Sequence, residues 1–226
     1  MTVARRGSCA DRSGIRYVAM NVLSGSARTA NRRRLRSGRT RGHRSMVSAA
    51  FSIYDIGHPK GTPDRSSPAR DAAVSLEDQI RADSLETGAF FARDGRLVVR
   101  KSGAPDRVTF TASELVGTDG TLFTHNHPDD ETFSQQDIVS AIESQLLELR
   151  AVGPTLRHLM SAPGGWPSKT AFSRAFQNSV NPANSVTAQM ISSGRLDRQY
   201  ARREVCHQFW CEVARKLSLR YSREKS

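Results

Sequence analysis

The spacing of apolar residues changes near the middle of the chain, and this change limits the fold to a combination of strands and helices. Residues 121–125 form an apolar run with a polar end, which predicts a β-strand. From Ser134 onward the spacing becomes helical, with one face formed by Ile138, Ile142, Leu146 or Leu147, and Leu149. The Gly153-Pro154 pair predicts the end of this helix.

Other strands are predicted on both sides of this segment. Residues 88–93 and 96–101 are expected to form two strands joined by a tight turn at Asp94-Gly95, a dipeptide typical of hairpins. Residues 108–111 are β-branched and aromatic and predict a third strand, so that 121–125 is the fourth. Residues 156–160 predict a fifth strand.

Helices and a linker complete the predicted organisation. Helices are expected over 76–83, 169–190 and 196–220, of which the last is basic and amphipathic. Residues 47–74 are rich in Gly, Pro, Ser and Asp, which predicts a linker. The order of strands, helix, strand and helices predicts one α/β domain over 75–226, with a mixed β-sheet flanked by helices.

Positive charge is concentrated at the beginning of the chain. Residues 1–46 contain 12 of the 34 Lys and Arg residues and one of the 22 acidic residues, so they carry nearly all of the formal net charge of +12. Such a composition buries too little apolar surface to offset conformational entropy, which predicts disorder. Three interpretations stay open: nucleic-acid binding, a transit peptide, or an extension without function before a start at Met46.

The cysteine content and the lack of long apolar stretches indicate the compartment. No run of 18 apolar residues is present, so no transmembrane helix and no membrane partner are expected. No apolar segment typical of a secretory signal follows the N-terminal arginines. The three cysteines form an odd set without a repeated Cys-x-x-Cys pattern. These features predict a reducing compartment and a cytoplasmic protein.

Candidate metal ligands lie between the fourth strand and the helix that follows it. His125 and His127 are two residues apart at a strand end, so both side chains leave the same face of the chain. Ser134 and Asp137 have the spacing of a helix N-cap and its third helical residue. If that first turn folds back onto the strand end, two imidazoles and a carboxylate converge. This is the ligand set of a catalytic zinc site, with a fourth position for water.

These residues resemble a known family. His125-x-His-Pro128 followed by Ser134-x-x-Asp137 is similar to the core motif of the JAMM (JAB/MPN) metallopeptidases, which include deubiquitinating enzymes. The form His-Asn-His-Pro resembles the bacterial, DNA-repair-associated RadC proteins. The wider segment, with Thr-His-Asn-His-Pro and Phe-Ser-x-x-Asp-Ile, resembles JAB-like domains of phage head-morphogenesis proteins and phage-associated toxins. The resemblance covers about residues 80–165, and its His-to-Ser interval is one residue shorter than in RadC-like members.

The resemblance implies a fold and a set of roles. It implies an MPN/JAB-like mixed sheet flanked by helices. It implies that His125, His127 and Asp137 bind Zn²⁺ and that Ser134 helps to hold a tetrahedral oxyanion.

The resemblance also implies a general base, which in this family is a Glu on an early strand. Glu86 lies at the corresponding position, just before the strand predicted over 88–93. Glu77 and Glu114 are weaker candidates, because neither of them leads into a strand.

The motif and its neighbours also have structural interpretations. Ser134-Gln-Gln-Asp137 is compatible with an ordinary capping box, and Asn126 with Pro128 is compatible with a turn. A second metal site at Cys206, His207 and Cys211 is disfavoured, because only His207 and Cys211 share a helical face.

Two aromatic side chains elsewhere are expected to pack in the interior. His158 alternates with apolar neighbours, which favours a structural role. Trp166 is expected to pack as well, although a position in a substrate groove is the alternative.

The sequence as a whole favours a zinc-dependent hydrolase of peptide or isopeptide bonds. Its expected substrate is a protein or peptide, with ubiquitin-like tails among the candidates. The alternative is a non-catalytic or DNA-associated JAB-like module of a phage or mobile element. In that case the Arg-rich residues 1–46 would contact nucleic acid.

Overall fold

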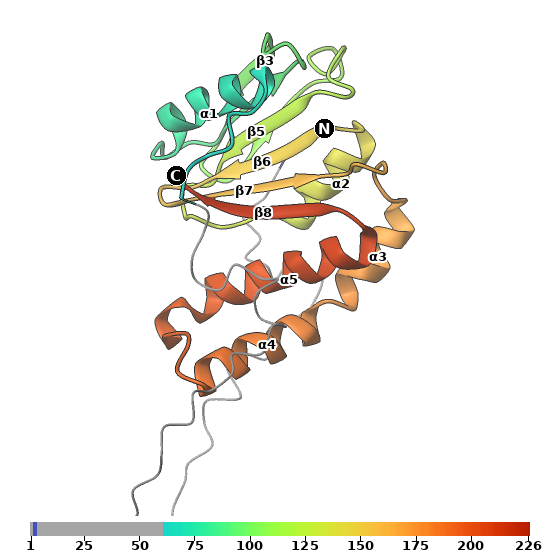
Figure 1. Cartoon of the computed structure of the whole chain (residues 1–226). Helices are drawn as coiled ribbons and strands as arrows, with labels where there is room; N and C mark the ends of the chain where they lie inside the picture. The colour runs from blue at the N-terminus through green and yellow to red at the C-terminus, as the bar shows by residue number, and fades with distance from the viewer. Residues whose placement is uncertain (1, 4–60) are drawn as a thin grey trace, which may run out of the picture.

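A mixed β-sheet with helices on both faces forms the core of the protein (Figure 1). The computed structural model describes residues 2–3 and 61–226. The helices are α1 (Pro68–Ile80), α2 (Gln135–Glu143), α3 (Lys169–Gln177), α4 (Val180–Ser192), the 3-10 helix η3 (Arg198–Tyr200) and α5 (Ala201–Leu217). The strands are β1 (Thr2–Val3), β2 (Thr87–Phe91), β3 (Leu97–Ser102), β4 (Val108–Thr109), β5 (Leu122–Asn126), β6 (Glu148–Val152), β7 (Leu156–Ser161) and β8 (Arg220–Lys225).

The six-stranded sheet has the order β3-β2-β5-β6-β7-β8. Strands β5 and β6 are parallel, and α2 connects them, as a parallel pair requires a crossover. The other neighbouring pairs of this sheet are antiparallel. The predicted α/β class with a mixed sheet is therefore confirmed. Strand β5 lies inside the sheet, so strands on both sides fix the position of its C-terminal end.

Each face of the sheet is covered by its own apolar cluster. Helix α1 packs Ala73 and Ile80 against Phe91 of β2 and other residues on one face. On the opposite face, α2 and α5 contribute Ile138 and Trp210 to a larger cluster with buried sheet residues. Figure 1 shows α1 on one side of the sheet and α4 and α5 on the other. Helix α4 contacts α5.

The predicted hairpin is confirmed. Strands β2 and β3 pair antiparallel, and their bounds differ from the expected ones by a few residues. Gly95 in the connecting turn has a φ of 87°, a conformation that favours glycine.

Helix α1 begins earlier than expected. A helix was predicted over 76–83, after a linker that ended at residue 74, but the helix begins at Pro68 and ends at Ile80. The Ser67 side chain accepts the N–H of Arg70, and Pro68 occupies the first helical position. The linker prediction is thus wrong for 68–74, because a Ser-Pro pair typical of turns also starts helices.

The prediction of one long helix up to Gly153-Pro154 is also wrong. Helix α2 ends at Glu143, and Gln145 has a positive φ of 45°, which reverses the chain before β6. Strand β6 is buried on both faces. A strand of that kind carries no alternation of apolar and polar residues, so the sequence did not distinguish it from a buried helix.

The C-terminal part differs from the predicted helices at two points. The segment 169–190 is divided into α3 and α4 at Asn178 and Ser179. The segment 196–220 is helical only to Leu217, where Ser218 takes a left-handed conformation and β8 then pairs with β7. None of the helices in the described residues is long and apolar enough to cross a membrane.

The N-terminal prediction falls almost wholly outside the described residues. Within the Arg-rich segment 1–46, the structure describes β1, which pairs antiparallel with β4. The rest of that segment, and the predicted linker as far as residue 60, lie outside the described residues.

A buried ion-pair network joins α1 to the sheet. Glu77 is fully buried, and its carboxylate accepts hydrogen bonds from Arg150 Nε at 2.6 Å and from Arg157 Nε at 2.8 Å. It also accepts the hydroxyl of Thr124 at 2.7 Å. Burial alone would raise the pKa of Glu77, but Arg150, Thr124 and Arg157 hold it below its ordinary value. Glu77 is therefore a structural carboxylate and ionised at neutral pH.

Glu77→Gln is expected to lower the free energy of unfolding by about 3–5 kcal/mol, because it leaves two buried guanidinium groups without their common anion. Chemical denaturation at neutral pH measures this loss. Asp71→Asn is the matched control, since it removes an exposed ion pair with Arg65 and should cost less than about 1 kcal/mol. Equal losses in the two variants would contradict the interpretation.

A second buried polar cluster lies between β7, β8 and α5. The hydroxyl of Tyr221 lies 3.0 Å from His158 Nδ1 and 3.3 Å from His207 Nδ1. With a single hydroxyl proton, Tyr221 donates to one imidazole and accepts from the other. Burial lowers the pKa of His158 well below its ordinary value, and burial and Arg223 lower that of His207 to about 3. Both histidines are therefore neutral at pH 7, and the structural role predicted for His158 agrees with these contacts.

The metal-free protein is expected to lose stability between pH 7.5 and pH 5. In the folded state the pKa of His158 and that of His207 are depressed, so the unfolded chain binds protons first as the pH falls below about 6.5. Each histidine contributes a loss on the order of 2 kcal/mol by pH 5. Denaturant titrations in the presence of a chelator measure the slope, which His207→Gln should reduce. A flat profile would show that these histidines are accessible to protons.

Candidate metal centre

The two candidate histidines lie on one face of β5, as their spacing predicted. Thr124 and Asn126 point to the face covered by α1, and His125 and His127 point to the opposite face. His125 is fully buried and His127 is 7% exposed. Their Nε2 atoms are 2.9 Å apart.

The first turn of α2 brings Asp137 to these histidines. Ser134 is the N-cap: its Oγ accepts the N–H of Asp137 at 3.2 Å, and its own N–H donates to Asp137 Oδ2 at 2.7 Å. Asp137 Oδ1 lies 3.6 Å from His125 Nε2, and Oδ2 lies 3.9 Å from His127 Nε2. The capping box and the candidate site are thus the same structure, because the box orients the carboxylate toward the imidazoles.

The loop after His127 fixes the tautomer of that residue. His127 Nδ1 lies 3.0 Å from the carbonyl oxygen of Glu131, which can only accept, so Nδ1 carries the proton. The lone pair of His127 Nε2 then faces the site, which is the arrangement required of a metal ligand.

Asp130 holds this loop in place, a role that the sequence pattern did not predict. Its φ is 59°, and its Oδ1 accepts the N–H groups of Thr155 at 2.9 Å and Leu156 at 3.1 Å in the β6–β7 turn. Arg203 of α5 forms an ion pair with its Oδ2 at 3.2 Å. In the sequence, only the residue type pointed to this backbone conformation, because Asp tolerates the left-handed region better than most residues.

Among the three carboxylates considered as bases, Glu86 lies at the site. Gly88 pairs with His125 across β2 and β5, and the same register two residues further places Glu86 opposite His127. Glu86 is 2% exposed, and its Oε1 lies 3.8 Å from His127 Nε2. Glu77 binds Arg150 and belongs to the network on the other face of the sheet.

Glu114 lies apart from these groups in a different environment. It is partly exposed, and its two carboxylate oxygens bind Lys101 Nζ at 2.9 and 2.8 Å.

The donor atoms fit a metal ion. One ligand atom from each of His125, His127 and Asp137 lies within 4.8 Å of the others, and all three residues are buried. Ligands at about 2.0–2.1 Å from a tetrahedral zinc are about 3.3 Å apart, close to these separations. Within the described residues, Asp137 Oδ1 is a buried oxygen without a hydrogen-bond partner. A cation between the three side chains would satisfy it.

The protonation states suit metal binding at neutral pH. Burial and the neighbouring His125 lower the pKa of His127 to about 4. Burial alone would raise the pKa of Asp137, but His125, His127 and the N–H of Ser134 hold it below its ordinary value. The two groups are thus neutral imidazole and carboxylate, the forms that bind metals.

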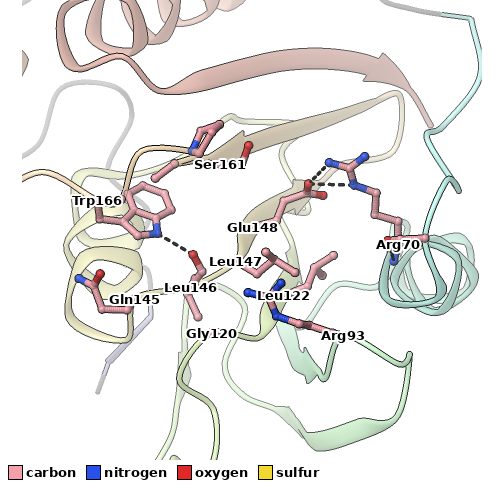
Figure 2. A pocket seen from close by; sticks show the side chains of 14 residues that line it. Arg70, Arg93, Gly120, Leu122, Gln145, Leu146, Leu147, Glu148, Ser161 and Trp166 are labelled. Carbon is pink, nitrogen blue, oxygen red and sulfur yellow. Dashed lines mark hydrogen bonds and ion pairs between the residues drawn. The ribbon is translucent and has the colours of Figure 1, made fainter.

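The remaining candidate residues lie away from this centre. Trp166 donates its Nε1–H to the carbonyl of Leu146 at 2.6 Å and borders a pocket of about 570 Å³ (Figure 2). This pocket includes Leu122 and Glu148, at the ends of β5 and β6 opposite to the histidines. Trp166 therefore does not line a groove at the metal centre.

The cysteine and histidine side chains on α5 form no second centre in the described part of the chain. His207 Nε2 lies 3.7 Å from Cys211 Sγ, as their spacing on one helical face predicted. No third metal-binding side chain joins this pair among the described residues.

Comparisons with protein-family models, with curated proteins and with solved structures give no match to this chain.

Wild-type protein purified after growth with zinc is expected to contain about one metal ion per chain, and His127→Ala to contain less than a tenth of that. Loss of one imidazole leaves two ligands, which hold zinc weakly. Elemental analysis measures both. His207→Ala is the control, because it removes a buried imidazole away from the centre and should retain the metal. Metal-free wild-type protein under these conditions would contradict the site.

Proposed function

We propose that this protein is a zinc-dependent hydrolase of the JAMM (JAB/MPN) type that cleaves peptide or isopeptide bonds. The observation that carries the proposal is the position of Glu86. Its buried carboxylate lies 3.8 Å from His127 Nε2, beside a donor set of two imidazoles and a carboxylate. A proton acceptor next to a metal site is the arrangement that hydrolysis requires. The proposal includes an MPN/JAB-like fold, which the mixed sheet and the β5–α2–β6 order support.

The identity of the metal is part of the proposal. Two imidazoles and one carboxylate suit zinc with an open position, and the same donor set also suits ferrous iron. Glu86 favours zinc, because iron oxygenases activate oxygen and do not need a general base beside the metal. Elemental analysis of protein grown without added zinc distinguishes the two metals.

The side chains of the site have separate tasks. When bound, zinc would lower the pKa of a coordinated water toward about 7 and polarise the scissile carbonyl. Glu86 accepts a proton from the attacking water at Oε1 and returns it to the nitrogen of the leaving amine. Its burial excludes bulk water, which strengthens the electrostatic interactions in the site.

Ser134 is proposed to stabilise the oxyanion. Its Oγ accepts the N–H of Asp137, so the hydroxyl hydrogen can donate to another acceptor. The side chain is half-buried at the N-terminus of α2, where the helix dipole also favours negative charge.

The substrate is proposed to be a protein or peptide, with ubiquitin-like tails among the candidates. The proposed cytoplasmic location rests on the cysteine pattern of the sequence, and the disulfide formed by Cys206 counts against it. The alternative, a non-catalytic or DNA-associated module, depends on the Arg-rich segment and thus on residues outside those described. The experiment below includes a result that would favour this alternative.

Glu86→Gln is expected to retain zinc and to lose at least about 100-fold in hydrolysis rate, since the amide cannot accept the proton. Zinc-loaded protein is assayed by mass spectrometry against ubiquitin-like tails linked to lysine and against matching linear peptides. Ser134→Ala is expected to show a loss on the order of 100-fold.

Glu114→Gln is the matched control, because it changes a carboxylate bound to Lys101 away from the metal centre and should have wild-type activity. Equal cleavage by wild type and Glu86→Gln would exclude Glu86 as the base. No cleavage by zinc-loaded wild type on any substrate would favour the non-catalytic alternative.

A further inference from the structure

The side chain of Asn126 joins the metal-binding strand to the connection between α1 and β2. Asn126 stands between the two histidines in the sequence but points to the opposite face of β5, where it is fully buried. Its Oδ1 accepts the N–H of Thr87 at 2.6 Å. Its Nδ2 donates to the carbonyl oxygens of Leu85 at 3.1 Å and Asp83 at 3.3 Å.

These hydrogen bonds bracket Glu86, because Leu85 and Thr87 are its neighbours in the chain. The main-chain pairing of β2 with β5 extends only as far as Gly88 and His125. Beyond that point, the amide of Asn126 connects the two strands and holds the backbone on both sides of Glu86.

The turn before β4 holds the backbone of Glu86 from the other side. The N–H of Glu86 donates to the carbonyl of Ala104 at 3.0 Å, and the carbonyl of Glu86 accepts the N–H of Gly103 at 2.8 Å. Glu86 therefore has a fixed backbone, and the amide of Asn126 supplies the contacts on the side of the metal-binding strand.

Only a primary amide of this length meets both requirements. Asn126 must accept one main-chain N–H and donate to two main-chain carbonyls from a single buried position. An Asp would keep the acceptor but place a carboxylate oxygen against the carbonyls of Asp83 and Leu85. A small apolar residue would leave the N–H of Thr87 without its acceptor.

We propose that Asn126 is a positioning residue that sets the distance between Glu86 and the metal ligands. The inference rests on the proposed function, in which Glu86 is the base. The residue between the histidines thereby contributes to catalysis without contact with substrate. A displaced Glu86 lowers the rate of proton transfer, which requires hydrogen-bond reach, whereas the metal and substrate contacts remain.

The test compares Asn126→Asp and Asn126→Ala with wild type in zinc content, kcat and KM, on the substrate that wild type cleaves best. Both variants are expected to retain zinc, to keep KM within about twofold and to lose about 10–100-fold in kcat. Thr124→Val is the matched control. It removes a buried side-chain hydrogen bond from the same face of the same strand, toward Glu77, and should keep kcat within about threefold.

A double-mutant cycle separates positioning of Glu86 from general destabilisation. In the Glu86→Gln background, Asn126→Ala is expected to change the residual rate by less than about twofold, since both substitutions remove the same contribution. Two independent effects that multiply would overturn the proposal, as would wild-type kcat in both Asn126 variants. If Asn126→Asp does not fold, Asn126→Ala decides between these outcomes.

The outcomes also distinguish this proposal from the proposed function. If Glu86→Gln is fully active, the role of Glu86 fails and the role of Asn126 fails with it. If Glu86→Gln is inactive while the Asn126 variants are fully active, only the positioning role is wrong.

Discussion

The carboxylate of Glu77 fixes the relative positions of four elements. It extends from α1 and binds Arg150 of β6, Arg157 of β7 and Thr124 of β5 in the buried interior. Separation of these charges would leave the buried carboxylate of Glu77 without its two arginine partners, at a cost of several kcal/mol, so the register of the strands is strongly determined. Thr124 adjoins His125 in the chain. The ion-pair network on one face thus fixes the strand whose other face carries the candidate metal centre.

The metal centre itself consists of polar groups in an apolar environment, which is unfavourable unless their hydrogen bonds are made. Other groups of the protein form hydrogen bonds with only some of the polar atoms of this site. Asp137 Oδ2 accepts the N–H of Ser134, and His127 Nδ1 donates to Glu131, whereas Asp137 Oδ1 and His125 Nδ1 have no hydrogen-bond partner in the described residues. A bound cation would satisfy Asp137 Oδ1 and would also explain why both Nε2 atoms point toward it.

The features that depend on local residue spacing could be predicted from the sequence. The features that depend on contacts between distant parts of the chain could not. The histidines two residues apart and the capping box at Ser134 required only the geometry of one strand and one helical turn, and the structure brings them together. Strand β6 could not be recognised, because burial on both faces removes the alternation that identifies strands. Asp130 and Asn126 could not be assigned roles, since their partners lie 25–26 and 39–43 positions away in the chain. The role of Glu86 was predicted from the resemblance alone. The register of β2 against β5 accounts for its position beside His127.

The period of a β-strand explains how three consecutive residues can serve two purposes. Alternation directs His125 and His127 to the candidate metal centre and Asn126 to the opposite face, where the chain that carries Glu86 passes. The two histidines and the backbone on both sides of the proposed base are therefore linked through the side chain of Asn126. Through the amide of Asn126, the end of β5 and the chain around Glu86 form one hydrogen-bonded unit. Such a linkage is expected to hold Glu86 at a set distance from the candidate metal centre, and proton transfer requires that distance to stay within hydrogen-bond reach.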